Sequence, residues 1–494
     1  MNKKAVVIGA GFSGISAATH LAANGFDVHV LEKNETLGGR ARSFKTENGF
    51  VFDMGPSWYW MPDVFENHFA AFGKKVSDYY DLKRLDPSYQ VIFEDGDVVK
   101  LPAQMNELEV LFERMESGSV PHLRQFLKEA AYKYHVGMNE FVTKPSHSIF
   151  EFVDWRVLKS FFQLDMFTKM SDYVSRHFKN DKLRQIIEFP VLFLGATPQN
   201  TPALYSLMNY ADLALGTWYP MGGMHKIIEG MISLAIDEGV RFHAGKEVSE
   251  ILTKGNLATA VKTISGEIFE ADVVVGSADY NHIDIKLLSE KDKNYSAQYW
   301  NQRVMAPSSL LFYLGVNKRL KNLEHHNLFF DTDFNQHAHD IYDAPQWPSA
   351  PLFYASVPSI TDSSVAPDGC ENLFLLIPIA TDLEDSEALR EKYYDIIMQR
   401  LEFRTGQSIR DCIIFKRSYC ITDFKKDYHA YKGNAYGLAN TLLQTAFLKP
   451  KLKNKHLKNF WYAGQLTTPG PGVPPSIISG KVAAVDILKQ FKMG

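Results

Sequence analysis

The chain has 494 residues, more than one hydrophobic core usually serves, so two or three domains are expected. Hydrophobic residues make up 45% and charged residues 22%, as in ordinary globular proteins, and the net charge of −4 excludes a basic footprint for nucleic acid. The three cysteines, Cys370, Cys412 and Cys420, exclude a disulfide framework and indicate a reducing compartment. No run of about 18 apolar residues occurs, so no transmembrane helix is expected, and the apolar run at 5–8 is too short for a signal peptide.

A glycine-rich loop lies close to the N-terminus. An apolar run at 4–8 leads into Gly9-x-Gly11-x-x-Gly14 and then into an alanine-rich segment, which predicts a strand, a tight turn and a helix. Gly9 permits the turn, Gly11 lets the backbone approach a pyrophosphate, and Gly14 lets the helix pack on the strand. A second strand at 27–32 ends in an acid about 20 residues downstream, where a ribose would bind. The alternative is a glycine-rich turn in an ordinary α/β protein. The dinucleotide-binding residues predicted here are Gly9, Gly11, Phe12, Ser13, Gly14, Glu32 and Lys33.

Two further turns follow this unit. In Gly38-Gly39-Arg40, the arginine would place a permanent charge near the pyrophosphate, with help from Arg42; the alternative is a turn with a solvated arginine. A strand at 50–53 then runs into Gly55-Pro56-Ser57, where the flexible glycine and the rigid proline would let the chain pass close to a planar ring. Gly39, Arg40, Gly55, Pro56 and Ser57 are therefore predicted to line the same site.

The nucleotide pattern returns twice. The pair Gly222-Gly223 precedes a helix at 225–238 and strands at 240–242, 247–251 and 272–276. Near the C-terminus a strand at 459–463, a Gly/Pro loop and a helix at 477–489 form a further corner for a phosphate or a ring. The residues predicted to bind there are Gly464, Gly472, Val473 and Pro474.

The intervening segments differ in character. Residues 89–101 predict a hairpin and 104–190 predict helices. The segment 150–167 is amphipathic, rich in Phe and Trp with cations nearby, which suits either a bilayer interface or a helix buried in its own domain. The apolar run at 189–195 contains Pro190, which argues against a helix interior and suits a tunnel lining or plain core. Strands at 310–316 and 373–378 and a helix at 385–402, capped by Asp385, complete a sheet-containing region; its histidines lie among polar loop residues, so no metal site is predicted.

This succession of motifs resembles the flavin-containing superfamily of carotenoid desaturases, amine oxidases and protoporphyrinogen oxidases. Within it, 52–58 and the C-terminal Ala463-Gly464 and Pro469-Gly470-x-Gly472-Val473-Pro474 look like the bacterial phytoene-desaturase type, and most of all the bacteroidete-type 1′-hydroxycarotenoid 3,4-desaturases. The resemblance covers the whole chain and is weakest in the middle. It implies FAD as the cofactor, which the loop alone does not decide, and a backbone contact between Val248 and the adenine.

The resemblance also implies a domain plan. The fold would be α/β, with a Rossmann-like FAD-binding domain, a mixed-sheet substrate domain and a helical part that associates with the membrane. The predicted FAD-binding domain comprises 1–75, 219–280 and 451–494. The predicted substrate domain comprises 76–103 and 281–450, and the helical substrate- and membrane-associating region 104–218.

The activity implied is desaturation of a carotenoid. A polyene has no polar handle in its middle, so its site would be a long apolar tunnel that reaches the flavin. A hydride would pass to flavin N5 and a proton would leave the neighbouring carbon. No catalytic acid or base can be assigned from the sequence. The electron acceptor would be oxygen or a membrane quinone, and the protein would be cytoplasmic with peripheral membrane contact.

Four alternatives remain open. One is a phytoene desaturase, and another is an amine or porphyrinogen oxidase on the same scaffold. A third is an NAD(P)-linked saturase. The fourth, a lipid escort protein without flavin, is disfavoured by the intact Gly9, Gly11, Gly14 and Glu32. Which carotenoid is used, how many double bonds form and the oligomeric state are not predicted.

Overall fold

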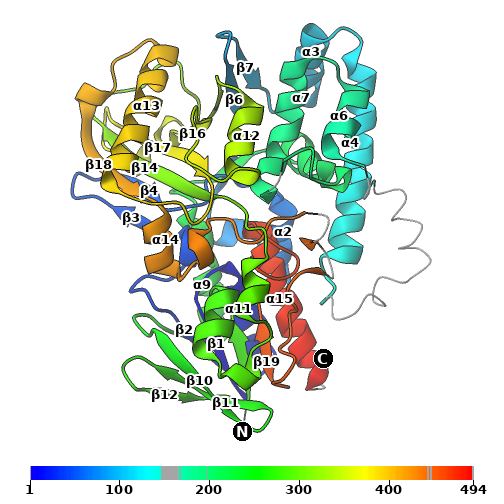
Figure 1. The fold of residues 1–494 in the computed structure, drawn as a ribbon, viewed down its shortest axis with the longest axis vertical. Helices are drawn as coiled ribbons and strands as arrows, with labels where there is room; N and C mark the ends of the chain where they lie inside the picture. Colours follow the sequence, from blue (N-terminus) through cyan, green and yellow to red (C-terminus); the bar gives the residue numbers. More distant parts are fainter. Residues whose placement is uncertain are drawn as a thin grey trace.

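The structure is a computed structural model that describes residues 2–145, 165, 168–195, 197–441, 444–445 and 448–491. Figure 1 shows two main regions, a lower one that holds both termini and an upper one built on a large sheet. The lower region contains a five-stranded sheet in which every strand pair is parallel. Its strands, in spatial order, are β19 (Phe460–Tyr462), β13 (Val273–Gly276), β1 (Lys4–Ile8), β2 (Asp27–Leu31) and β9 (Arg241–His243). This sheet therefore assembles from three separate parts of the chain.

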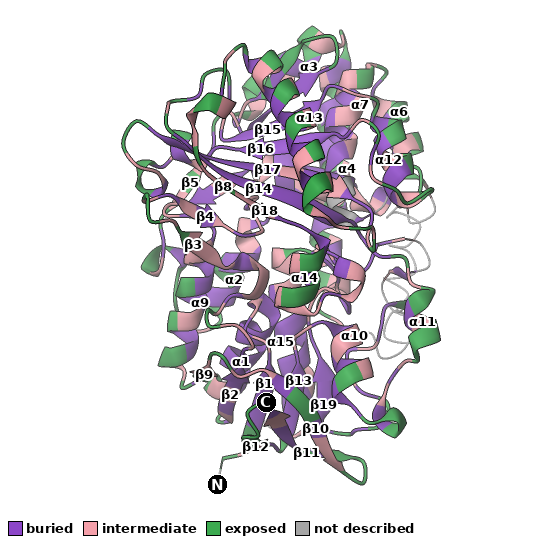
Figure 2. Ribbon diagram, turned by 60° about the vertical axis from the view of Figure 1, so that its left-hand side comes forward, coloured by how far each residue is buried: buried purple, intermediate pink, exposed green. Residues whose placement is uncertain are grey.

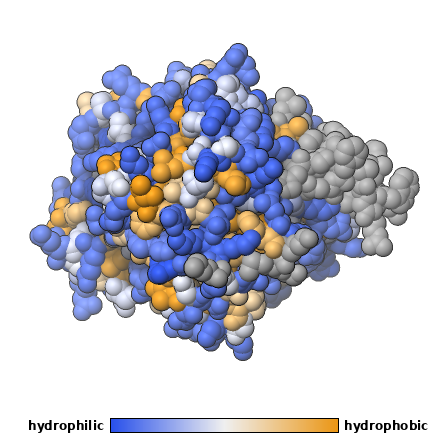
Figure 3. Space-filling model, turned by 90° about the horizontal axis from the view of Figure 1, so that it is seen from below, coloured by the Kyte–Doolittle hydropathy of each residue, from blue (hydrophilic) through white to orange (hydrophobic). Residues whose placement is uncertain are grey.

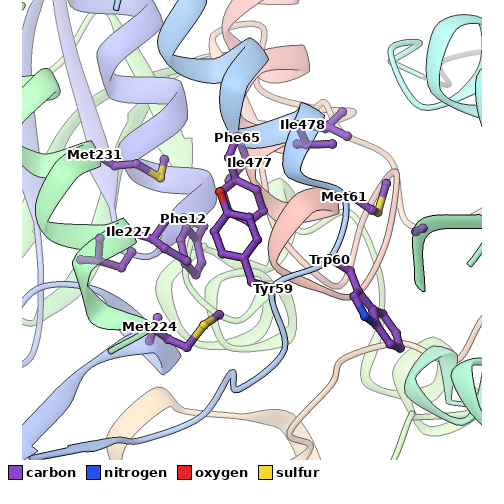
Figure 4. Close-up of a cluster of buried hydrophobic side chains, with 14 of the residues drawn as sticks. Phe12, Tyr59, Trp60, Met61, Phe65, Met224, Ile227, Met231, Ile477 and Ile478 are labelled. Carbon is purple, nitrogen blue, oxygen red and sulfur yellow. The ribbon is translucent and has the colours of Figure 1, made fainter. Parts of the chain in front are cut away.

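The parallel sheet is covered on both faces, which explains why β1 is apolar at successive positions. Ala5 and Val7 belong to the core shared with the helices α1 (Phe12–Ala23), α9 (His225–Asp237) and α15 (Val473–Gln490). Val6 and Ile8 belong to the core beneath a three-stranded antiparallel sheet, β10 (Val248–Lys254), β11 (Leu257–Thr263) and β12 (Ile268–Glu270). Figure 4 shows the helix side of this core, where Phe12, Ile227 and Ile477 from the three helices meet Phe65 of α2 (Pro62–Ala70).

The upper region is organised by a seven-stranded mixed sheet. Only β15 and β6 run parallel among its neighbouring strands. One face packs on α13 (Glu387–Thr405) through alternate residues such as Leu310, Phe312 and Leu375. The strands, in spatial order, are β18 (Ile413–Tyr419), β14 (Ser308–Val316), β17 (Glu371–Ile379), β16 (Phe353–Ser356), β15 (His326–Phe330), β6 (Tyr89–Phe93) and β7 (Val98–Leu101). Figure 2 shows these strands buried, with exposed residues on the outward side of α13.

Helices flank the upper sheet at the end opposite α13 (Figure 1). They are α3 (Met105–Met115), α4 (Ser119–Val136), α6 (Met170–His177) and α7 (Asp181–Glu188), and α12 (Phe334–Tyr342) lies nearer the sheet. Two short antiparallel pairs form separate two-stranded sheets: β3 (Ser43–Lys45) with β4 (Val51–Asp53), and β5 (Leu82–Arg84) with β8 (Trp218–Pro220). No helix among the described residues is long and apolar enough to cross a membrane.

Two local predictions need correction, a third becomes more precise, and a fourth lies outside the described residues. The C-terminal helix begins at Val473, not at 477, because Pro474 and Pro475 fit the first turn, where their missing N–H groups cost nothing. The cap of α13 is Ser386, whose side chain accepts from Leu389 N, while Asp385 pairs with Arg390 at 2.7 Å. Phe189–Leu194 forms a 3-10 helix with its proline in the first turn. The amphipathic segment predicted at 150–167 lies outside the described residues except for Asp165.

Candidate active site

The glycine loop lies where β1 passes into α1. Gly9 has φ of +101°, a conformation that strains other residues, and its N–H donates to the Leu31 carbonyl at 2.8 Å. A Cβ on Gly14 would stand 2.0 Å from the Gly9 carbonyl oxygen, so only glycine lets α1 begin this close to the strand. The helix cap is Gly11, which offers no side chain to the first N–H groups. These donors remain available for an anion, as a bound pyrophosphate requires.

Glu32 lies at the carboxyl end of β2 and is 5% exposed. One carboxylate oxygen accepts from the Ala10 N–H at 2.9 Å, and the other accepts from the Asn34 N–H at 2.9 Å. These bonds hold the carboxylate beside the glycine loop, where Glu32 also lines the cavity described below. The position fits the ribose contact that the sequence predicts.

Arg40 stands in η1 (Gly39–Ala41), on the other side of the loop. It donates to the Asn434 carbonyl at 3.2 Å and lies over the Tyr428 ring at 5.1 Å. Burial lowers the pKa of its guanidinium, while the nearby Asp279 carboxylate opposes that shift. Its buried Nε has no hydrogen-bond partner among the described residues, so the side chain retains a donor for an anionic ligand. Arg42, in contrast, pairs with Asp427 at 2.9 Å and does not line the cavity, which corrects the predicted role at the pyrophosphate.

One continuous cavity of about 470 Å³ joins these residues to the upper sheet. It is lined by every predicted cofactor-binding residue except Gly14, which lies beneath the loop and acts through packing. The lining members of that set are Gly9, Gly11, Phe12, Ser13, Glu32, Lys33, Gly39, Arg40, Gly55, Pro56, Ser57, Val248, Gly464, Gly472, Val473 and Pro474. The structure thus brings together segments that lie more than 400 residues apart in the chain.

Close backbone approaches shape the nucleotide half of this cavity. A Cβ on Gly39 would be 3.1 Å from the Gly11 Cα, and one on Gly55 would be 2.5 Å from the Arg40 carbonyl oxygen. A Cβ on Gly464 would reach the Ser13 hydroxyl at 3.2 Å. Glycines therefore bring four loops to one narrow cradle. Free helix N–H groups, a buried arginine and an acid beside the cradle suit a dinucleotide.

The other half of the cavity lies under the seven-stranded sheet. Strand alternation points one set of side chains into it, opposite to the set that packs on α13. Register supports this assignment, because Leu328 stands opposite Tyr354, and Leu376 stands opposite both Tyr354 and Leu311. Apolar side chains dominate this half. They include Phe189, Leu311, Leu328, Phe330, Phe334, Ile341, Leu352 and Leu376.

A few polar groups interrupt this apolar lining. His337 uses both ring nitrogens inside the protein, at 2.9 Å from the Pro378 carbonyl and 2.6 Å from the Leu352 N–H. Tyr354 points its hydroxyl to His326 Nδ1 at 2.6 Å, and the His326 ring stacks on Trp58 at 4.2 Å. No group of three His, Cys, Asp or Glu side chains in the described parts of the chain is arranged to hold a metal.

A cover over the nucleotide half was not predicted from the sequence. Helix α14 (Ile421–Tyr428) and His429 line the cavity near Glu32 and Arg40. Asn34 Nδ2 donates to the Asp427 carbonyl at 3.2 Å, and His429 Nε2 lies 2.8 Å from Glu247 Oε1. The segment between 281 and 450 therefore closes over the groove that the first nucleotide motif forms.

A dinucleotide cradle that opens onto a long apolar cavity defines an oxidoreductase whose cofactor meets an apolar substrate. The family described as flavin containing amine oxidoreductase matches residues 12–488. A carotenoid 3,4-desaturase of Haloarcula japonica is 41% identical over 98% of each chain. A zeta-carotene-forming phytoene desaturase of Myxococcus xanthus is 33% identical over 97% of this chain and 93% of its own. The chain therefore belongs to the flavin-containing amine oxidoreductase family and, within it, to the carotenoid desaturases, which confirms the resemblance seen in the sequence.

A solved structure gives the same fold. An oxidoreductase from Methanosarcina mazei superposes with a TM-score of 0.63 at 16% identity, over 98% of this chain and 100% of that one. The protein is an enzyme of a flavin-containing family, and its cofactor is FAD.

Proposed function

We propose that this chain is an FAD-dependent carotenoid desaturase that introduces a 3,4 double bond into a 1′-hydroxycarotenoid. The observation that carries the proposal is the single cavity that runs from Gly9 to the apolar side chains beneath the upper sheet. A hydrocarbon chain needs shape and apolar surface along its length, and Leu328, Phe330 and Leu376 supply both. The high identity to a carotenoid 3,4-desaturase supports the position of the new bond.

The protein's part in this reaction is binding, orientation and exclusion of water. FAD, when bound, supplies the hydride acceptor. Glu32 would hold the ribose, and the N-terminus of α1 with Arg40 would hold the pyrophosphate. Helix α15 begins at Val473 on the cavity wall, and the positive end of its dipole favours negative charge there. The apolar half keeps water from the reacting carbons and lets conjugation alone stabilise positive charge on the polyene.

The experiment is product analysis with two substrates. Purified holoenzyme is incubated with phytoene and, separately, with a 1′-hydroxylated γ-carotene, and the absorption maximum is followed. A red shift with the hydroxylated substrate alone is expected, because a longer conjugated system absorbs at longer wavelength. A red shift with phytoene alone would identify a phytoene desaturase instead. Turnover of neither polyene, with oxidation of an amine or a porphyrinogen, would overturn the proposal.

We also propose peripheral contact with a membrane, where carotenoids dissolve, with oxygen or a membrane quinone as the final electron acceptor. The support is the amphipathic sequence at 150–167 with its nearby cations. On the side seen in Figure 3, the described atoms are mostly hydrophilic, with hydrophobic residues interspersed among them.

Liposome sedimentation tests the membrane contact. The wild type should sediment with vesicles that contain anionic lipid, and a variant with Phe161→Asp and Phe162→Asp should stay in the supernatant. The matched control is Phe403→Asp, which changes a side chain that is 77% exposed on α13 and should leave sedimentation unchanged. Equal sedimentation of the double variant and the wild type would refute the contact.

A further inference from the structure

Tyr354 places a hydroxyl in the apolar half of the cavity, where a hydrocarbon needs none. It lies on β16, in register with Leu328 on one side and Leu376 on the other, and all three line the cavity. Burying a hydroxyl in apolar surroundings costs about 1–3 kcal/mol unless it is hydrogen-bonded. A phenylalanine would pack as well against a purely hydrocarbon ligand, so the hydroxyl calls for an explanation.

His326 fixes the position of this hydroxyl from behind. Its Nδ1 lies 2.6 Å from Tyr354 Oη, and the ring is fully buried on β15. The ring lies parallel to Trp58, with 11° between the planes and 4.2 Å between the centroids. Burial lowers the pKa of His326 well below its usual range, so the imidazole is neutral. Stacking and register thus hold Tyr354 in one orientation.

The hydroxyls of Ser57 and Ser356 also interact with the Tyr354 hydroxyl, and Ser57 lines the cavity with it. Because serine hydroxyls rotate to suit their partners, Tyr354 and Ser57 together keep hydrogen-bonding capacity toward a ligand beside a neutral imidazole. If Nδ1 accepts the phenolic proton, the lone pairs of Oη can accept from a ligand; if Nδ1 donates, the phenolic O–H can donate to one. Either arrangement suits an alcohol, which both donates and accepts. His337 differs, because both of its ring nitrogens are bonded within the protein.

Tyr354 lies at the part of the cavity where the reacting end of a substrate would meet the flavin. Ser57 and Trp58 line the cavity beside it and directly follow the Gly55-Pro56 wall, while α12 contributes Phe334 and Ile341 to the lining. We propose that Tyr354, positioned by His326, binds a hydroxyl group at the reacting end of the polyene and so selects hydroxylated over hydrocarbon carotenoids. The inference rests on the proposed function and assigns its substrate specificity to one side chain.

Binding of reaction products tests this without turnover. Tryptophan fluorescence of the holoenzyme, quenched when a polyene enters beside Trp58, is titrated with two fully desaturated polyenes that differ only in the terminal hydroxyl. The wild type should bind the hydroxylated polyene roughly tenfold or more tightly than the hydrocarbon, because a site built for a hydroxyl rejects a ligand that lacks it. Tyr354→Phe should bind the hydroxylated polyene more weakly than the wild type does and the hydrocarbon equally well. The two affinities should therefore become equal.

Three further variants separate recognition from packing. His326→Leu should lose the preference as Tyr354→Phe does, while His326→Gln, which keeps a hydrogen-bonding group, should restore part of it. In turnover, the loss should appear in KM for the hydroxylated substrate more than in kcat. Tyr393→Phe is the matched control, since it likewise removes a buried phenol hydroxyl, which donates to the Pro348 carbonyl and lies outside the cavity. It should keep the preference.

Failure of the Tyr354 assignment and failure of the proposed function give different results. If the wild type desaturates neither polyene, the proposed function fails. If it desaturates a polyene but shows no preference for the hydroxyl, or if Tyr354→Phe keeps the wild-type preference or weakens both ligands equally, the assignment to Tyr354 is overturned while the desaturase remains.

Discussion

The two halves of the cavity are built by different means. The nucleotide half is formed by backbone at the carboxyl ends of parallel strands, and its close approaches at Gly14, Gly39 and Gly55 leave no room for side chains. The polyene half is formed by side chains that project from one face of the upper sheet, such as Leu328 and Leu376. The nucleotide half depends on residues that are close in sequence. The polyene half depends on pairing between strands that are far apart in sequence. Mutations should therefore affect the two halves in separable ways.

The largest expected effect is at the nucleotide half. Gly14→Ala would place a Cβ 2.0 Å from the Gly9 carbonyl oxygen and force α1 away from the loop. We expect most of the bound flavin to be lost and the free energy of unfolding to fall by about 1–3 kcal/mol, as overpacking usually costs. Flavin absorbance per protein and chemical denaturation measure the two effects. Gly137→Ala is the control, because its Cβ would meet only Leu207 Cδ2, at 3.6 Å. Full flavin content in Gly14→Ala would contradict the close packing described here.

A change on α12, in the polyene half, should spare the flavin. Ala338 lines the cavity from α12, so Ala338→Trp would fill space that a polyene needs. We expect kcat/KM for the carotenoid to fall roughly tenfold or more, on the scale of one or two misfitting groups in an apolar pocket. Flavin content should match the wild type.

The neighbouring residue supplies the control for this change. His339→Trp alters an exposed side chain on the same helix and should keep wild-type activity. Equal losses in both variants would show that the helix, not the cavity, is disturbed.

The smallest expected effect concerns the stability of the protein in acid. It depends on two buried histidines in helices beneath the nucleotide half. His68 of α2 and His20 of α1 are buried side by side, and burial lowers their pKa values to about 3 and about 4. Both stay neutral in the fold while the unfolded chain takes up protons, so stability is complete above the ordinary pKa of 6.5 and falls as the pH drops from there toward 3.

His68→Leu removes one of the two histidines that take up a proton when the chain unfolds. The loss of unfolding free energy between pH 7 and pH 5 should be smaller than in the wild type by about 2 kcal/mol. Denaturant titrations at the two pH values measure it. His122→Leu changes an exposed histidine and should behave like the wild type. An unchanged pH dependence in His68→Leu would refute burial of a neutral ring.

The contrast between the halves also explains what the sequence could predict. The strand, glycine turn and helix at 4–23 and the acid Glu32 form a local pattern, and the structure has each of these elements. The division of the whole chain into six segments remains a prediction, as do the individual contacts with FAD. The cover made by α14 was missed, because its contacts with Asn34 and Glu247 join residues with no shared motif.

The polyene half could not be predicted, because its strands lack the alternation of polar and apolar residues that would show which face is which. Residues 308–316 of β14 are buried throughout, so the cavity-facing Leu311 looks the same in sequence as Leu310, which faces α13. The sequence predicts a polar loop around the histidines of this region, whereas His326 begins the buried strand β15. The available signal was a histidine two residues before the apolar run at 328–330, and only the pairing of β15 with β16 shows that its partner is Tyr354.

The cover at 427–429 gives the cofactor a thermodynamic role as well. Because the cavity takes its walls from both sheets, FAD would touch the lower region through Glu32 and the upper region through Tyr428, and its binding free energy would also hold the two together. Heat resistance should then rise with the free flavin concentration. A cell short of flavin would hold a looser and more easily degraded protein, so its capacity to make carotenoids would follow its flavin supply through protein lifetime as well as through occupancy.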